Sequence, residues 1–179
     1  HVELTRNIVQ RFNGIYGDVF KMPEPYIPKA GARIMGLTTP DSKMSKSIPE
    51  GCVFLLEKPE DIQRKFKRAI TDSDTERCVR YDPQNKPGVA NLMNIYSAVT
   101  GKSFDEIERE FEGQGYGKFK PAVGDAVVET LRPIREEAQR ILADKAYLEK
   151  VYTEGAQKAS YVANKTLRKV YKKIGFVAR

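Results

Sequence analysis

The sequence predicts a mainly helical protein in which a small α/β piece, residues 1–50, precedes an all-helical part, residues 51–179. Two observations lead to this fold class. Apolar residues recur at helical spacing over most of the chain, whereas one short apolar run, residues 33–37, has the length and the flanking glycine and proline of a strand. The length of 179 residues suits one domain, or two small ones, with a sizeable core.

The first fifty residues change from helix to extended chain. A helix is expected over residues 2–16, and glycines at positions 14 and 17 end it. Three prolines make residues 19–28 extended. Residues 33–37 are expected to form a short buried strand, and residues 38–50 to form a polar loop. The apolar stripe of the first helix is Leu4, Ile8, Val9 and Phe12.

Three shorter helices are expected in the middle of the chain. The first begins at Pro59, because proline suits the first turn of a helix. A charged connector, residues 71–86, separates it from a second helix over residues 87–100. Ser103 and Glu106 have the spacing of a capping box, which predicts the start of the third helix. The apolar stripe of the first of these helices is Ile62, Phe66 and Ile70.

Two longer helices are expected at the end of the chain. The first covers residues 120–142, and Pro133 is expected to interrupt and kink it. The second begins after Asp144, a good N-cap residue, and reaches about Ile174, with Gly155 as a point where it weakens or divides. Tyrosines in these helices are expected to pack mostly between them. They are Tyr147, Tyr152, Tyr161 and Tyr171.

The net charge of +7 is concentrated at one end of the chain. Residues 1–144 hold 22 basic and 22 acidic side chains, whereas residues 145–179 hold 9 basic and 2 acidic ones. Five of these basic residues recur at helical spacing, so they share one face of the last helix. Such a face indicates a polyanion such as nucleic acid, and the alternative is a solvated surface that favours solubility. The five residues are Lys165, Arg168, Lys169, Lys172 and Lys173.

Several kinds of site are excluded by the rare residues. Cys52 and Cys78 form no CxxC pair, and His1 is the only histidine, so neither a conventional zinc site nor histidine-dependent catalysis is expected from this chain alone. Two thiols without a disulfide pattern favour a reducing, cytoplasmic location. No apolar stretch approaches the roughly 20 residues of a membrane helix, and no signal-peptide pattern follows the first residue, which resembles a fragment or processed end.

The loop at residues 38–50 carries the clearest chemistry, in the run Lys43-Met44-Ser45-Lys46-Ser47. Ammonium groups and small hydroxyls beyond the end of a strand suit phosphate oxygens, and exposed loop N–H groups add donors. Such a loop, closing over a triphosphate, would stabilise charge that develops on a leaving pyrophosphate. The glycines of a Walker A loop are missing. On spacing alone, a solvated lysine–serine turn is the alternative.

The five letters K-M-S-K-S are the second signature motif of class I aminoacyl-tRNA synthetases, and the sequence around them resembles the bacterial tryptophanyl-tRNA synthetases. The resemblance covers essentially the whole chain, with its motifs in the same order. One departure is Ile48, where the family often has Asp. The other matching stretches are GARIMGL at 31–37, TDS at 71–73, RYD at 80–82, KPGVANL at 86–92, IYS at 95–97, FEG at 111–113, YG at 116–117 and GAQKA at 155–159.

The resemblance implies a full-length enzyme that forms tryptophanyl adenylate from L-tryptophan and ATP and transfers the amino acid to tRNA(Trp). Lys43 and Lys46 would be its catalytic residues in this chain, holding the ATP phosphates in the transition state. Mg²⁺ would arrive with ATP, and neither a tightly bound cofactor nor a metal site within the chain is expected. The remaining ATP contacts would come from Met44, Ser45, Ser47 and the backbone of Ile34.

The resemblance also implies an organisation. Residues 1–50 would be the last part of a Rossmann-type nucleotide-binding domain, and residues 51–179 a helical anticodon-binding domain whose basic face contacts tRNA. The HIGH-type first signature motif and most of the tryptophan pocket would lie in a missing first half. The chain alone is therefore not expected to be catalytically competent, and the full-length enzyme is expected to be a homodimer.

Two other functions stay open on the sequence. A tyrosyl-tRNA synthetase shares the fold and a related lysine loop, but the bacterial enzymes usually carry a further RNA-binding domain after the helices. A non-catalytic helical RNA-binding module would explain the basic end, but it leaves the K-M-S-K-S run unexplained. The closely spaced carboxylates Asp72, Asp74 and Glu76 lack a metal-binding pattern and are interpreted as turn and capping groups.

Overall fold

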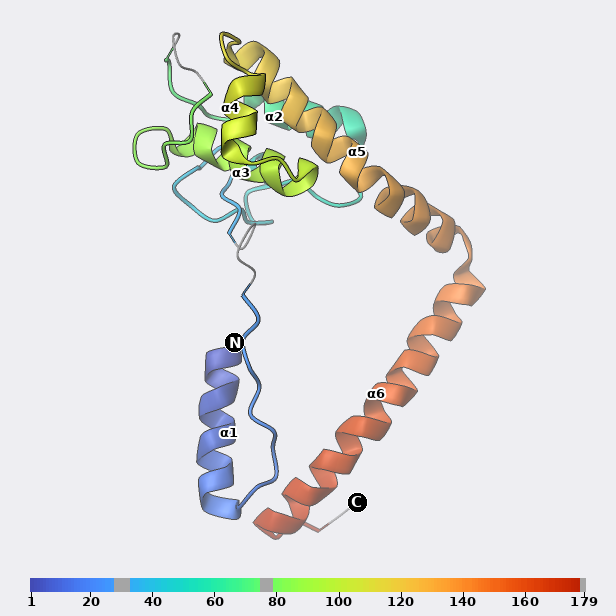
Figure 1. Cartoon of the computed structure of the whole chain (residues 1–179). Helices are drawn as coiled ribbons and strands as arrows, with labels where there is room; N and C mark the ends of the chain where they lie inside the picture. The colour runs from blue at the N-terminus through green and yellow to red at the C-terminus, as the bar shows by residue number, and fades with distance from the viewer. Residues whose placement is uncertain (28–32, 75–78, 178–179) are drawn as a thin grey trace. The chain divides into compact units, whose positions relative to one another are not determined.

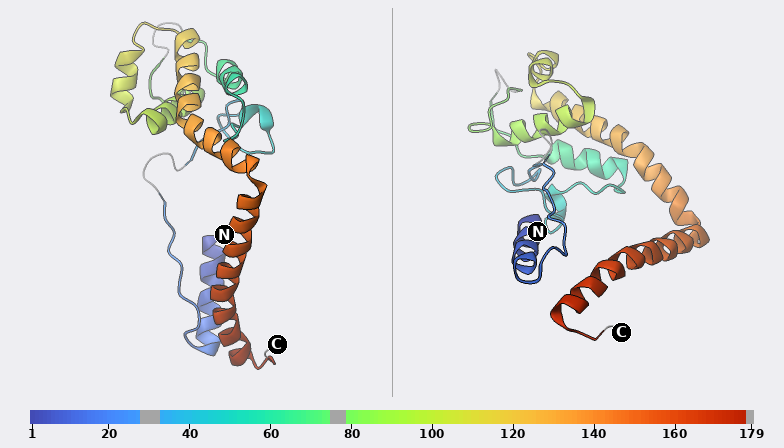
Figure 2. Two further views of the ribbon diagram at one scale, coloured as in Figure 1. Left: turned by 90° about the vertical axis from the view of Figure 1, so that its right-hand side faces the viewer. Right: turned by 60° about the horizontal axis from the view of Figure 1, so that its bottom comes forward.

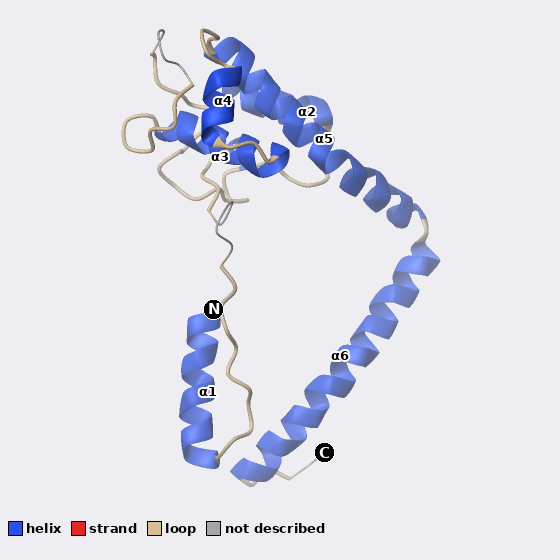
Figure 3. Ribbon diagram, viewed as in Figure 1, coloured by secondary structure: helices blue, strands red, loops and turns tan. Residues whose placement is uncertain are grey.

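The computed structural model describes residues 1–27, 33–74 and 79–177. It divides into two compact units, one made of His1–Ile27 with Ile141–Arg179 and the other of Pro28–Arg140. Figure 1 shows the helices of each unit. The regular structure in the described residues is helical (Figure 3), which confirms the mainly α fold class. The predicted boundary at residue 50 remains a prediction.

The hydrophobic core of the unit Pro28–Arg140 lies among four helices: α2 (Pro59–Arg68), α3 (Pro87–Thr100), α4 (Phe104–Glu110) and α5 (Tyr116–Ala143). Helix α3 is its centre, because eight of its residues are buried. Rings from three segments meet edge to face, with centroids 5.0 Å apart for Phe111 and Phe119 and 5.8 Å apart for Tyr96 and Phe111. This packing gives the residues before α2 a rigid platform.

Most predicted helix ends in this unit are confirmed. Helix α3 begins at Pro87 and ends at Gly101, whose φ of +76° closes the helix in the left-handed conformation. Ser103 and Glu106 form the predicted capping box of α4. Helix α2 ends at Arg68, however, so Ile70 lies beyond it and is 50% exposed. Its predicted place in the apolar stripe is therefore wrong.

Helix α5 begins one turn earlier than predicted and continues through two prolines, Pro121 and Pro133. The left view of Figure 2 shows α5 changing direction part-way along its length, as expected for a helix that contains proline. Its inward face carries Val123, Val127 and Val128, all of which are buried.

The predicted strand at residues 33–37 is wrong. In the described residues, this segment forms only an isolated antiparallel bridge between Met35 and Lys43. Its apolar character is confirmed, because Leu37 is 2% exposed and Ile34 packs against the core. A strand needs pairing along an edge, and the edge of this segment meets a side chain of α3 instead of another strand.

The unit made of both chain ends contains α1 (Val2–Tyr16) and α6 (Lys145–Ile174). Helix α1 has the predicted bounds and ends at Gly17, with a φ of +78°. Asn13 holds the chain that follows it, because its side chain accepts from the N–H groups of Val19 and Phe20 and donates to the Phe20 carbonyl. Residues 19–27 contain neither helix nor strand, as predicted for this proline-rich, loop-like segment.

Helix α6 is a single helix of 30 residues. Asp144 caps it as predicted, accepting from the Tyr147 N–H at 2.9 Å, and Gly155 does not divide it. None of its described residues is buried. Within this unit Tyr147, Tyr152 and Tyr161 are exposed. Their packing against the preceding helix remains a prediction. Among the described helices, none combines the length and apolar character required to cross a bilayer.

Candidate phosphate-binding site

The lysine loop leaves the core at a short stem, in which residues 34–36 and 42–44 pair around an isolated antiparallel bridge. The Gly36 N–H donates to the Ser42 carbonyl and the Met44 N–H donates to the Ile34 carbonyl, both at 2.9 Å. These two bonds flank the facing pair Met35 and Lys43. The stem therefore fixes the backbone position of Lys43 relative to the preceding segment.

The two lysines of the loop project from this stem into solvent. Lys43 and Lys46 are both exposed. Among the described residues, the lysines that form ion pairs are others: Lys65, Lys86, Lys102 and Lys150. Two accessible ammonium groups on one loop are suited to bind an anionic ligand, since neither is neutralised by a described carboxylate.

The other predicted ATP contacts divide between loop and core. Met44 is half-buried and packs against the core, so its side chain anchors the loop, and the Ile34 carbonyl is occupied by the Met44 N–H. The Ser45 hydroxyl accepts from the Ser47 N–H at 3.3 Å. Ser45 thus shapes the turn between the two lysines, and Ser47 is exposed beside it. Their roles toward ATP remain predictions.

Two anchors below the stem have no counterpart in the sequence-based predictions. The buried side chain of Asn91, on α3, accepts from the Met35 N–H and donates to the Met35 carbonyl, both at 2.9 Å. Leu37 bonds on both sides, donating to the Gly51 carbonyl at 3.0 Å and accepting from the Ile70 N–H at 2.8 Å. The segment before the loop is thus tied to α3 and to the chain that follows α2.

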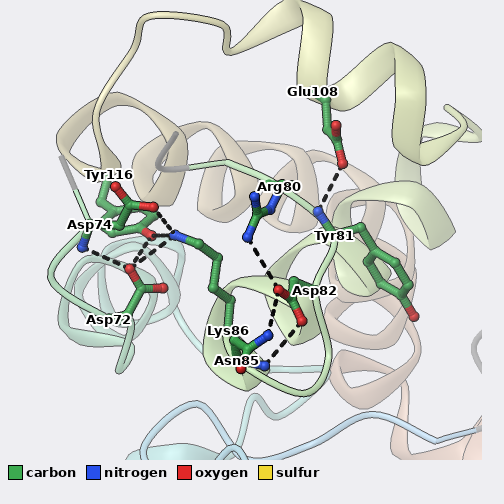
Figure 4. A network of polar contacts seen from close by, with 9 residues as sticks. All are labelled: Asp72, Asp74, Arg80, Tyr81, Asp82, Asn85, Lys86, Glu108 and Tyr116. Carbon is green, nitrogen blue, oxygen red and sulfur yellow. Dashed lines mark hydrogen bonds and ion pairs between the residues drawn. The ribbon is translucent and has the colours of Figure 1, made fainter. Parts of the chain in front are cut away.

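A buried lysine organises the connector between α2 and α3 (Figure 4). The Lys86 side chain is 6% exposed, and its ammonium lies 3.1 Å from Asp72 Oδ1 and 2.7 Å from Asp74 Oδ2. The Tyr116 hydroxyl, at the start of α5, donates to Asp72 Oδ1 at 2.8 Å. Asp72 also accepts from the Asp74 N–H, so the predicted turn role is confirmed for Asp72, and the ion pairs are additional. Glu76 lies outside the described residues.

This network shifts the pKa of each member. Burial alone would raise the pKa of Asp72, but hydrogen bonds from the Asp74 N–H, Tyr116 and Lys86 outweigh it and lower the pKa. Burial opposes the charge of Lys86, but its bonds to Asp74 and Asp72 raise its pKa. Burial and the bond donated to Asp72 raise the pKa of Tyr116. At neutral pH Asp72 is therefore ionised, Lys86 is charged and the Tyr116 phenol is neutral.

The R-Y-D stretch also has structural partners. Asp82 accepts from the backbone and side-chain N–H groups of Asn85 and lies 3.2 Å from Arg80 (Figure 4). The Tyr81 N–H donates to Glu108 of α4 at 2.8 Å, and the Tyr81 ring stacks on Phe104 at a centroid distance of 3.8 Å. These contacts place residues 80–86 against α4 and build the turn that leads into α3.

The five basic residues predicted to contact nucleic acid all lie on α6 and are exposed. Lys165 and Arg168 line a surface pocket of about 410 Å³ together with Tyr161 and Asn164. Positive charge beside an exposed aromatic ring and an amide is a combination that suits nucleic acid. In the described residues, no group of three or more His, Cys, Asp or Glu side chains is placed to hold a metal ion.

Comparison with known families identifies this arrangement. The family model of the class I tRNA synthetases for W and Y matches residues 1–132. The chain belongs to this family of tRNA synthetases. The lysine loop, Asn91 and the Lys86 network all lie within the matched residues. Helix α6 lies beyond the matched residues.

Individual synthetases match the whole chain. The tryptophan–tRNA ligases of Clostridium tetani and Clostridium acetobutylicum are 55% and 50% identical in alignments 179 positions long, which cover 99% of this chain and 52% of each relative. This chain thus spans about half the length of these relatives.

Solved synthetase structures give the same result. The tryptophanyl-tRNA synthetase of Mycoplasma pneumoniae superposes with a TM-score of 0.83 at 26% identity, covering 99% of this chain and 55% of that one. The Campylobacter jejuni enzyme, solved with ADP and tryptophan, gives a TM-score of 0.70 at 27% identity, covering 98% and 54%. The fold of this synthetase chain therefore recurs in experimentally determined relatives.

Proposed function

We propose that this chain is the carboxy-terminal half of a tryptophan–tRNA ligase and that its lysine loop binds the phosphates of ATP. The observation that carries the proposal is the identity of 55% and 50%, over the whole chain, to two tryptophan–tRNA ligases. The intact K-M-S-K-S run, held on a defined stem with both ammonium groups exposed, supplies the matching chemistry.

In this proposal, the full-length enzyme activates tryptophan by attack of its carboxylate on the α-phosphate of MgATP, and pyrophosphate leaves. Lys43 and Lys46 stabilise the negative charge that develops on the phosphates, and Ser45 holds the turn between them. The HIGH-type motif and most of the tryptophan pocket lie in the other half of the enzyme. Residues 1–50 belong to its Rossmann-type domain, and residues 51–179 form the helical anticodon-binding domain.

In the second reaction of this proposal, the transfer of tryptophan to its tRNA, the basic face of α6 binds the tRNA. Lys165, Arg168, Lys169, Lys172 and Lys173 contact tRNA(Trp) through its phosphates, in a cytoplasmic enzyme that is homodimeric at full length. Support comes from the concentration of net charge in residues 145–179 and from the exposure of these five residues.

The test is amino-acid-dependent ATP–pyrophosphate exchange. The full-length protein is expected to show exchange with tryptophan and not with tyrosine, and this chain alone is expected to show none. Exchange with tyrosine would identify a tyrosyl enzyme instead. Binding of tRNA by the full-length protein without exchange would favour a non-catalytic RNA-binding module, and robust exchange by this chain alone would show that it is not an incomplete half.

A further inference from the structure

We infer that Asn91 is a positioning residue for the lysine loop, setting the place of Lys43 through the backbone of Met35. This inference rests on the proposed function. It names a residue of α3, far from the signature motif in sequence, as a determinant of how that motif meets ATP.

The hydrogen bonding of the stem leaves Met35 with two polar groups to satisfy. The bonds between Met44 and Ile34 and between Gly36 and Ser42 lie on either side of the pair Met35–Lys43. In an antiparallel pair of this kind, the N–H and carbonyl of Met35 point away from Lys43, toward the outer edge. A partly buried peptide group at such an edge is stabilised by a hydrogen-bond partner.

The side-chain amide of Asn91 supplies both partners. Its Oδ1 accepts from the Met35 N–H and its Nδ2 donates to the Met35 carbonyl, each at 2.9 Å. One side-chain amide therefore replaces the peptide group of a neighbouring strand. Asn91 is 3% exposed, so water does not compete for these two bonds.

The helix that carries Asn91 is itself fixed against the stem. Its neighbours Val89 and Leu92 are 0% and 1% exposed. The backbone of Gly88 lies so close to Ile70 that a Cβ atom there would overlap the Ile70 carbonyl oxygen, while the Ile70 N–H donates to the Leu37 carbonyl. Because α3 packs closely against Ile70 and Ile70 is hydrogen-bonded to Leu37, the side chain of Asn91 holds Met35 in a fixed position relative to α3.

Loss of the Asn91 bonds is expected to displace Lys43 more than Lys46. Lys43 faces Met35 directly across the stem, so a shift of the Met35 backbone moves its Cα atom. Lys46 lies in the following turn, which closes through its own bond from the Ile48 N–H to the Ser45 carbonyl. Small displacements of a group that stabilises transition-state charge are costly, and about 1 Å can reduce the rate by roughly 100-fold.

The experiment replaces Asn91 with leucine, which has the same number of side-chain heavy atoms and the same branching at Cγ but offers no hydrogen bond. The matched control is Asn94→Leu, one turn further along α3, at a residue with no described bond to the stem. In the full-length enzyme we expect Asn91→Leu to lower kcat for tryptophan-dependent ATP–pyrophosphate exchange by about 10- to 100-fold. The KM for tryptophan and the activity of Asn94→Leu are expected to stay within about twofold of wild type. A merely structural role for Asn91 would not produce this difference between kcat and KM.

Amide exchange in the 179-residue chain tests the same inference without activity. Asn91→Leu is expected to speed exchange of the Met44 amide by about tenfold or more while leaving the Val123 amide in the core unchanged. In the wild-type chain, the side-chain NH₂ of Asn91 is expected to exchange much more slowly than that of the exposed Asn7. The wild-type comparison requires no variant, so it decides the matter even if Asn91→Leu unfolds.

Two results would overturn the inference: unchanged kcat together with unchanged Met44 exchange in Asn91→Leu, or an Asn91 NH₂ that exchanges as fast as that of Asn7. Failure of the proposed function is recognised separately, because the wild-type full-length protein would then show no tryptophan-dependent exchange. In that case the amide measurements would still decide whether Asn91 holds the loop.

Discussion

Replacing Lys86 with methionine tests the buried network that joins the connector to α3 and α5. The substitution removes an ammonium group that lies 3.1 Å from Asp72, 2.7 Å from Asp74 and 3.3 Å from the Tyr116 hydroxyl, while methionine still fills the space of the apolar stem. The Asp72 carboxylate then has too few hydrogen-bond partners, because its Oδ2 atom is already buried without a partner among the described residues.

The magnitude follows from burial. Removing one member of a buried ion pair costs about 3–5 kcal/mol. The Asp72 and Asp74 side chains are 25% and 35% exposed, so water recovers part of this energy, and we expect Lys86→Met to lower the free energy of unfolding by about 2–3 kcal/mol. Adding Asp72→Asn removes the uncompensated charge, so the double variant is expected to recover at least about 1 kcal/mol of that decrease.

The assay is urea unfolding of the 179-residue chain, followed by far-ultraviolet circular dichroism. Lys102→Met is the matched control, since Lys102 has one carboxylate partner at 2.7 Å and is 41% exposed, and it is expected to cause little change. The reasoning is refuted if Lys86→Met costs less than about 1 kcal/mol, or if the double variant is as unstable as the sum of the two single variants.

Three further predictions concern packing, pH and RNA binding. Gly88→Ala is expected to destabilise the chain by about 2 kcal/mol in urea unfolding, because the new Cβ would overlap the Ile70 carbonyl. Gly155→Ala, in open space on α6, is expected to stabilise the helix by up to about 1 kcal/mol. Equal effects of the two substitutions would contradict the close approach of Gly88 to Ile70. The pKa of Asp72 is held below 3.8, so ionised Asp72 stabilises the fold above that pH and the contribution is lost as the pH falls through the lower, folded-state pKa. Acid unfolding of Asp72→Asn is therefore expected to be less steep below about pH 4 than that of wild type, and identical profiles would show that the shift is absent. Reversing charge at Lys169 and Lys173 in the full-length protein is expected to weaken tRNA binding and to reduce the salt slope by about one for each phosphate that the protein no longer neutralises, and an unchanged slope would reject the basic face.

Local signals predict the helices well, because each boundary depends on a few adjacent residues. Pro87 and Gly101 define α3, and Ser103 with Glu106 defines the start of α4, as the structure shows. The segment 33–37 cannot be placed in the same way. Its apolar letters indicate burial, but whether it becomes a strand depends on a pairing edge, and in this chain that edge faces Asn91.

Some residues of the candidate site can likewise be recognised from the sequence, and others cannot. The lysine loop is recognisable because its five letters are contiguous. Asn91 and Lys86 cannot be assigned a role from sequence, because their partners, Met35 and Asp72, lie 56 and 14 positions away, and a buried amide or lysine has no local sequence signal. The stretches KPG and TDS do contain residues of opposite charge, but nothing in their sequence indicates that these residues pair in the folded chain.

The most direct measurement of the central claim is tryptophan-dependent ATP–pyrophosphate exchange by the full-length protein carrying Lys43→Met or Lys46→Met. Both ammonium groups are exposed on the loop, so neither change should alter folding. Each variant is expected to show a kcat about 100-fold or more below wild type, because the lysine stabilises charge that develops in the transition state. Lys58→Met, at an exposed residue before α2, is expected to retain wild-type exchange. Wild-type exchange by the Lys43 and Lys46 variants would contradict the assignment of this loop to the phosphates of ATP.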